Sequence, residues 1–148
     1  MALLESVRTE MMRHDGSGCV RAMTYRLKSP ASIRDKLKKK GLPASAHAAL
    51  IALRDVAGLR VVLDSVESVY LFARLLSNST ALEITGVNDY IAFPKPSGYR
   101  SLHLLARLPV CVKGQTAMIP VEIQLRTAAM DIWASIEHAV CYKPVVQA

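Results

Sequence analysis

The sequence lacks the features of disulfide-stabilised and zinc-stapled proteins. It has three cysteines in 148 residues, and they form no CxxC pair. An odd number of scattered cysteines argues against a disulfide framework and against a zinc site of the usual spacing. We therefore expect Cys19, Cys111 and Cys141 to be reduced thiols.

Long hydrophobic runs are missing as well. The longest, from Leu42 to Leu53, is interrupted by His47 and is too short to cross a bilayer, which takes about 20 apolar residues. The N-terminal stretch MALLESVRTEMMRHD is charged and lacks the apolar segment of a secretory signal. We therefore expect a cytoplasmic protein without a membrane partner.

Repeats, low-complexity segments and linkers are also absent, so the length predicts a single domain over residues 1–148. The composition, 51% hydrophobic and 21% charged, is typical of a globular protein. The formal net charge of +7 favours anionic partners such as nucleotides, nucleic acid or an acidic surface. This identifies a class of partner only.

Hydrophobic periodicity and capping residues predict alternating helices and strands. The expected helices cover residues 2–14, 30–40, 43–54, 65–77 and 128–141, and the expected strands cover 19–27, 59–63, 84–92, 101–110 and 118–126. A turn at Lys113-Gly114-Gln115 joins the last two strands as a hairpin. The strands outnumber simple βαβ units, so we predict an α+β fold with a mixed, mostly antiparallel sheet flanked by helices.

The stretch NDYIAFPKPSGYRSLH, at residues 88–103, is the first candidate for a ligand site. Prolines on both sides of Lys95 stiffen this loop, and Gly98 permits a sharp turn. If a strand follows, alternate side chains share one face, which would gather Tyr99, Ser101 and His103. Such a loop suits a phosphorylated, ring-bearing ligand, although an ordinary loop and edge strand would have the same pattern.

Three further patterns concern side-chain direction. In the last strand, alternation places Glu122, Gln124 and Arg126 on the face opposite Val121, Ile123 and Leu125. In the second helix, Ser32 and Lys36 lie one turn apart on the same face and could both reach a phosphate. In the closing helix, which Thr127 caps, helical spacing directs four apolar residues toward the core: Met130, Trp133, Ile136 and Val140.

Several segments in chain order resemble the synthetase domain of the RelA/SpoT family, and most closely the single-domain small alarmone synthetases. They are YRLKSPASIRDKL, RDVAGLRVV, DYIAFPKPSGYRSLH, VEIQLRTAAMDIWASIEH and CYK. The resemblance implies a nucleotidyltransferase-like domain that is a GTP diphosphokinase. Such an enzyme transfers the β,γ-diphosphate of ATP to the ribose 3′-hydroxyl of GDP or GTP, which gives ppGpp or pppGpp and releases AMP.

The resemblance also implies roles for individual residues. Asp55 and Glu122 are expected to bind Mg²⁺, and Glu122 to act as the base for the 3′-hydroxyl. The expected ATP-binding residues are two arginines that sandwich the adenine and three phosphate contacts: Arg26 and Arg60, then Lys28, Ser32 and Lys36. On the acceptor side, we expect an aromatic residue that stacks on guanine, with polar groups around it: Tyr99, then Lys95, Ser97, His103 and Gln124. Arg126 is a plausible supporting group beside them, whereas Glu137 and His138 are expected to anchor the last helix.

The sequence also departs from the family. Relatives often have a lysine where Asn88 stands, and the helices before Arg26 and after the Tyr142-Lys143 motif are shorter than in typical members. One alternative therefore stays open: a catalytically impaired member that binds nucleotides or a partner. The basic helix near residues 36–40 leaves a second one open, a transferase acting on an adenine nucleotide or the 3′ end of RNA. A homo-oligomer is also left open. The HD-type metal-binding pattern of bifunctional relatives is absent, so we expect synthesis only.

Overall fold

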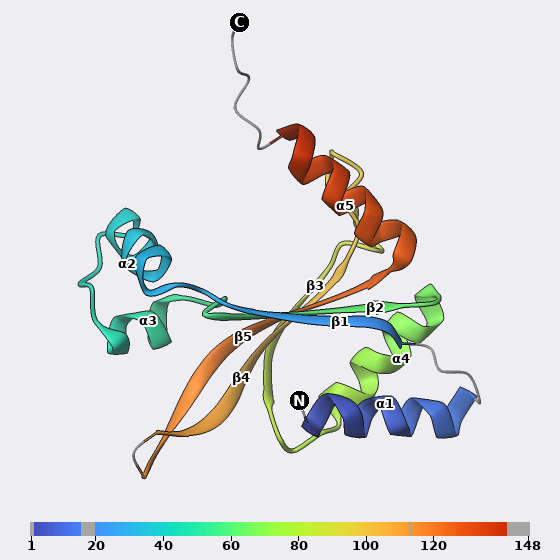
Figure 1. The fold of residues 1–148 in the computed structure, drawn as a ribbon, viewed down its shortest axis with the longest axis horizontal. Coiled ribbons are helices and arrows are strands. Elements are labelled where there is room, and N and C mark those ends of the chain that lie inside the picture. Colours follow the sequence, from blue (N-terminus) through green and yellow to red (C-terminus); the bar gives the residue numbers. More distant parts are fainter. Residues whose placement is uncertain (1, 16–19, 113, 142–148) are drawn as a thin grey trace, which may run out of the picture.

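The computed structural model describes residues 2–15, 20–112 and 114–141. Its elements follow the order expected from the sequence (Figure 1). They are α1 (Ala2–Asp15), β1 (Val20–Leu27), α2 (Pro30–Lys39), α3 (Ala46–Ala52), β2 (Ala57–Leu63), α4 (Val66–Ser77), β3 (Glu83–Asp89), β4 (Leu102–Val112), β5 (Gln115–Thr127) and α5 (Ala128–Cys141).

The boundaries of α2 confirm the capping residues seen in the sequence. The Ser29 side chain accepts a hydrogen bond from the backbone N–H of Ser32, which satisfies one of the free donors at the start of the helix. Gly41 has φ of +68°, and the backbone N–H of Leu42 donates to the carbonyl of Leu37 at 3.0 Å. This arrangement is the glycine-terminated C-cap expected at that position.

Several boundaries differ from the prediction by one to three residues, and two of these differences have a clear local cause. Helix α3 begins at Ala46 instead of Pro43, because the Ser45 side chain caps it by accepting the N–H of Ala48. Strand β3 ends at Asp89 instead of Ala92. The Asp89 carboxylate accepts the backbone N–H groups of both Ile91 and Ala92 at 2.9 Å, and this local capping turns the chain out of the sheet.

The five strands form one sheet in the order β1-β2-β5-β4-β3. Strands β2 and β5 are parallel, and the other neighbouring pairs are antiparallel. This confirms the α+β fold with a mixed, mostly antiparallel sheet. The register pairs Gly58 and Arg60 of β2 with Glu122 and Gln124 of β5, and pairs His103 of β4 with Gln124. The middle of the sheet thus collects polar residues from separate parts of the chain.

Helices α1 and α4 lie together on one side of the sheet (Figure 1) and form the main core with it. Their contribution includes Val7, Met11 and Phe72, and the sheet contributes Ile123 and Leu125, all of them buried. Helices α2 and α3 pack separately around Leu37, Ala49 and Leu53 at one end of the sheet. Because the apolar face is covered by α1 and α4, the other face is available for polar side chains.

Helix α5 corrects one prediction about the core. Met130 is buried as expected, but Trp133, Ile136 and Val140 are 48%, 51% and 73% exposed. The physical reason is that α5 lies on the side of the sheet away from α1 and α4 (Figure 1), so only a narrow stripe of it, which includes Ala134, becomes buried. Helical spacing identifies an apolar stripe but does not show whether a partner surface exists for it.

No helix in the described part of the chain has the length and apolar character needed to cross a membrane. Cys111 is an exposed free thiol, as predicted. The predictions for Cys19, for the side chain of Cys141 and for the Tyr142-Lys143 motif lie outside what the structure describes.

Candidate active site

Strand β5 positions the site because its side chains alternate between two faces. Ile123 and Leu125 are 2% and 0% exposed in the core, so Glu122, Gln124 and Arg126 face the opposite side, as the sequence predicts.

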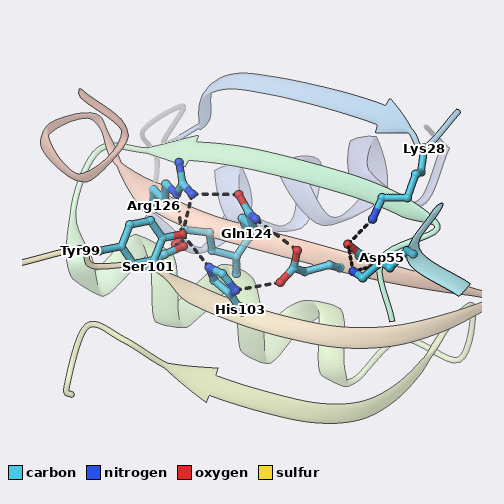
Figure 2. A network of polar contacts seen from close by, with 10 residues as sticks. Lys28, Asp55, Tyr99, Ser101, His103, Gln124 and Arg126 are labelled. Carbon is cyan, nitrogen blue, oxygen red and sulfur yellow. Dashed lines mark hydrogen bonds and ion pairs between the residues drawn. The ribbon is translucent and has the colours of Figure 1, made fainter. Parts of the chain in front are cut away.

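Five side chains form a closed ring of hydrogen bonds, here called the polar ring (Figure 2). Glu122, Gln124 and Arg126 come from β5, His103 comes from β4, and Tyr99 comes from the loop before β4. His103 Nδ1 lies 3.0 Å from Glu122 Oε1, and His103 Nε2 lies 2.8 Å from the Tyr99 hydroxyl. The Arg126 guanidinium donates to that hydroxyl oxygen at 2.6 Å and to Gln124 Oε1 at 2.9 Å. Gln124 Nε2 closes the ring by donating to Glu122 Oε2 at 3.3 Å.

With a neutral His103 that has its proton on Nδ1, proton donation in the polar ring runs from Arg126 to Glu122. An arginine can only donate, so the Tyr99 oxygen accepts from Arg126. With the Tyr99 hydroxyl proton given to His103 Nε2, the neutral imidazole carries its own proton on Nδ1 and donates it to Glu122. Each member then both orients and satisfies its neighbours, which holds the Glu122 carboxylate in place.

The same contacts set the charge of Glu122. The hydrogen bond from His103 lowers the pKa of Glu122, burial raises it, and the net pKa lies below the ordinary value. The negative charge of Asp55 acts in the raising direction, which places the two carboxylates within electrostatic reach of each other. Glu122 is therefore ionised at neutral pH, as a ligand of a cation must be. It is a weak proton acceptor unless substrate binding raises its pKa.

Asp55 lies in the connection between α3 and β2 and is held by two lysines. Lys28 Nζ donates to Asp55 Oδ2 at 2.5 Å, and Lys36 Nζ lies 2.8 Å from both carboxylate oxygens. Burial raises the pKa of Asp55, but the hydrogen bonds and charges of the two lysines outweigh it, and the net pKa is lowered. The hydrogen bond to Asp55 in turn raises the pKa of Lys36.

A cavity of about 310 Å³, here called the donor cavity, opens between β1, β2 and β5. Its walls include most of the residues expected to bind ATP and metal: Arg26, Lys28, Asp55, Arg60 and Glu122. Two carboxylates on one wall suit Mg²⁺, which takes one or two protein carboxylates and completes its shell with water and substrate phosphates. In the described part of the chain no cluster of three or more His, Cys, Asp or Glu ligands exists. The pair Asp55 and Glu122 therefore fits a Mg²⁺ ion that is bound partly by substrate phosphates better than a structural metal ion held by the protein alone.

A second cavity of about 640 Å³, the acceptor cavity, lies between the polar ring and α5. Its lining includes Lys95, Tyr99, His103 and Gln124, all expected on the acceptor side. Arg60 and Gln124 line both cavities. The two cavities are therefore neighbours that share walls on β2 and β5.

Comparison with known proteins decides the family. The family model described as "Region found in RelA / SpoT proteins" matches residues 25–146. The chain belongs to the RelA/SpoT family.

Individual relatives agree with this. The chain is 41% identical to GTP pyrophosphokinase YwaC of Bacillus subtilis over 118 residues, which is 80% of this chain and 56% of that protein. It is 34% identical to GTP pyrophosphokinase YjbM of the same organism over 140 residues, 95% of this chain and 65% of that protein. The chain thus spans between one half and two thirds of these relatives. The fold matches the crystal structure of small alarmone synthetase 1 from Bacillus subtilis bound to its product pppGpp, with a TM-score of 0.80 and 35% identity over 95% of this chain and 73% of that one.

Three expected site residues of this RelA/SpoT chain do not line either cavity in the described structure: Ser32, Lys36 and Ser97. Lys36 still binds Asp55, which lines the donor cavity. Ser32 takes part in the N-cap of α2, where its hydroxyl accepts from Ser29 at 2.9 Å. Ser97 accepts the indole N–H of Trp133 on its backbone carbonyl at 3.2 Å, and its hydroxyl accepts the N–H of Tyr99. Both serines are exposed, and their expected substrate contacts remain predictions.

Tyr99 also differs from the expected open stacking surface in this RelA/SpoT chain. It is only 8% exposed. Lys95 Nζ lies 4.7 Å from the centre of its ring and equally close to the ring of Tyr90. Arg126 Cζ lies 5.2 Å from the Tyr99 ring centre. Lys95 thus occupies space over the Tyr99 ring that a stacked base would need on that face.

The structure adds two residues to the site. Arg126, at first a plausible supporting group, is 4% exposed and sits at the centre of the polar contacts. Strand alternation in the sequence predicts the face of the sheet on which Arg126 lies, but it does not predict which residues Arg126 binds. Asp131, on the first turn of α5, binds Arg126 through Oδ1 at 3.1 Å. No sequence pattern pointed to Asp131, because the contact joins a strand residue to a helix residue at the point where β5 passes directly into α5.

Proposed function

We propose that this RelA/SpoT chain is a GTP pyrophosphokinase that makes ppGpp or pppGpp from ATP and GDP or GTP. The main support is the position of Glu122, which lines the donor cavity and is also bound through His103 and Gln124 to the wall of the acceptor cavity. A phosphoryl transfer between two nucleotides requires such a meeting point, because positioning and charge stabilisation carry most of the catalysis. The names of the relatives and the product bound to the similar structure support the same reaction.

In this proposal the donor nucleotide occupies the donor cavity. Arg26 and Arg60 present guanidinium groups, which stack well on a planar base. Lys28 and Lys36 form ion pairs with Asp55. In the proposed complex they would bind the donor phosphates in place of this carboxylate. Mg²⁺ held by Asp55 and Glu122 would supply neutralisation of the phosphate charge that builds up during transfer.

The acceptor nucleotide occupies the acceptor cavity. Tyr99 would take the guanine once Lys95 swings from the rings of Tyr90 and Tyr99 toward the phosphates. The proton of the 3′-hydroxyl would pass to Glu122, whose neighbour His103 already binds Oε1 at 3.0 Å and keeps the carboxylate in one orientation. This role of Glu122 is general base catalysis by a carboxylate whose proton affinity must rise when substrate excludes water.

The test is turnover of labelled ATP with GDP, GTP and GMP, in Mg²⁺ and in a chelator, for the wild type and for Glu122→Gln. We expect ppGpp or pppGpp together with AMP from the wild type in Mg²⁺ only, and a loss of at least 100-fold in Glu122→Gln. Calorimetric binding of both nucleotides to both proteins is the control. If the nucleotides bind and the wild type is as inactive as the variant, the chain is a nucleotide-binding protein and the proposal is wrong.

A further inference from the structure

Asp131 connects two arginines that belong to different parts of the site. Its Oδ1 oxygen lies 3.1 Å from Arg126 NH1 and 3.4 Å from Arg60 NH1. Asp131 is not among the described residues that line the donor or the acceptor cavity. It therefore lies outside both linings but contacts Arg60, which lines both cavities, and Arg126, which lines the acceptor cavity.

Arg126 depends on this carboxylate because its side chain is buried, with 5% of its surface exposed. The remaining partners of its guanidinium are neutral: Tyr99, Gln124 and Ser101. A buried positive charge requires an opposite charge as well as hydrogen bonds. Asp131 is the carboxylate that meets this need.

Arg60 depends on the same carboxylate for a different reason. Its side chain is 42% exposed and lines both cavities. Its Nε atom is buried without a hydrogen-bond partner among the described residues. The contact of NH1 with Asp131 is therefore what fixes the direction of the guanidinium. Without it, two guanidinium groups that now share one oxygen would face each other as like charges.

We propose that Asp131 is a positioning residue that couples the two nucleotide sites, so that binding of one nucleotide strengthens binding of the other. A donor nucleotide that fixes Arg60 also fixes Asp131, and through it Arg126 and the Tyr99 hydroxyl. The acceptor then meets a wall that is already ordered and loses less conformational freedom on binding. This inference rests on the proposed function, because it takes the donor cavity to hold ATP and the acceptor cavity to hold GDP.

The experiment measures the dissociation constant of AMPCPP, a non-hydrolysable ATP analogue, by calorimetry without and with saturating GDP. The wild type is expected to bind AMPCPP at least about 5-fold more tightly when GDP is present, the lower end of ordinary coupling between sites. Asp131→Asn keeps the shape but removes the charge, and the ratio should fall to about 1. Asp131→Glu keeps the charge and should retain part of the ratio.

The control is Asp64→Asn, which removes a carboxylate from an ion pair with Arg21, and neither of these two residues lines the donor or the acceptor cavity. It should keep the wild-type ratio. If Asp131→Asn does not fold, Arg60→Ala serves in its place. It removes the other end of the connection. Because Arg60 lines both cavities, AMPCPP and GDP should each bind more weakly by themselves, and the ratio between AMPCPP binding with and without GDP should fall to about 1.

Three results would overturn the inference. They are a wild-type ratio of 1, an unchanged ratio in Asp131→Asn, and an unchanged ratio in Arg60→Ala. Failure of the wild type to bind AMPCPP and GDP at all would instead refute the proposed function, and the inference with it. Turnover by the wild type with an unchanged ratio in the variants refutes only the coupling role of Asp131.

Discussion

Replacing Tyr99 with phenylalanine removes the hydroxyl group of this residue, so the role of the hydroxyl can be measured apart from that of the ring. The hydroxyl accepts from Arg126 at 2.6 Å and lies 2.8 Å from His103 Nε2. All three side chains are buried, at 8%, 4% and 7% exposure. The substitution keeps the ring that would stack on a base but leaves two buried polar groups with one partner fewer.

The expected cost follows from these two contacts. A hydrogen bond to a charged group contributes about 1.5–3 kcal/mol, and a neutral one about 0.5–1.5 kcal/mol. Arg126 retains Gln124 as a partner for the same nitrogen, so the charged contact belongs at the lower end. The free energy of unfolding should fall by about 2–3 kcal/mol. In a domain of this size the melting temperature should fall by about 4–12 °C.

Urea unfolding followed by circular dichroism measures this loss. Tyr25→Phe is the matched control, because Tyr25 is 74% exposed, and its change should stay within about 0.5 kcal/mol. A loss below about 0.5 kcal/mol in Tyr99→Phe would show that the polar ring does not stabilise the fold as argued. Turnover should fall as well, because His103 then loses the contact that orients it toward Glu122.

Three further predictions concern other parts of the structure. The ion pairs of Asp55 lower its pKa, so the stability they add is present above the unfolded pKa of about 3.9 and disappears as the pH falls through the lower folded value. The difference in unfolding free energy between wild type and Asp55→Asn should therefore be constant from pH 7 to pH 5 and shrink below about pH 4 in urea titrations; a difference that grows in acid contradicts this. Trp133, the single tryptophan, donates to the carbonyl of Ser97, so GDP should change its fluorescence, and an unchanged spectrum at saturating GDP argues against acceptor binding beside this loop. Gly98→Ala and Gly41→Ala, at φ of +81° and +68°, should each destabilise the fold by about 1–2 kcal/mol, but only the change at Gly98 should weaken GDP binding in calorimetry.

Local patterns were enough to predict most of the fold. Alternation along residues 118–126 assigned the core face and the polar face of β5 correctly, and the serine and glycine caps of α2 lie where expected. These features depend on neighbours within a few residues, so the sequence contains all the information they need. The predicted start of α3 at Pro43 was wrong, because the sequence offers two local starting points there and the helix begins after the cap formed by Ser45.

Motif resemblance identified the family, which the comparisons confirm. It also named residues that the structure brings together around Asp55 and Glu122. It did not show the state of these residues. Asp55 is held by Lys28 and Lys36, and Tyr99 is covered by Lys95. Such contacts arise between segments that the sheet order makes neighbours, and no motif describes them.

The sequence by itself thus determined the order of elements, the polar face of β5 and the membership in the RelA/SpoT family. Only the tertiary structure decided that α5 lies away from the α1 and α4 layer, which leaves Trp133 and Ile136 exposed instead of in the core. It also decided that Asp131 of α5 meets Arg60 and Arg126 at a single oxygen. The reason is that burial and ion pairing depend on which surfaces meet, and this is set by the packing of the whole sheet with its helices, beyond any local pattern.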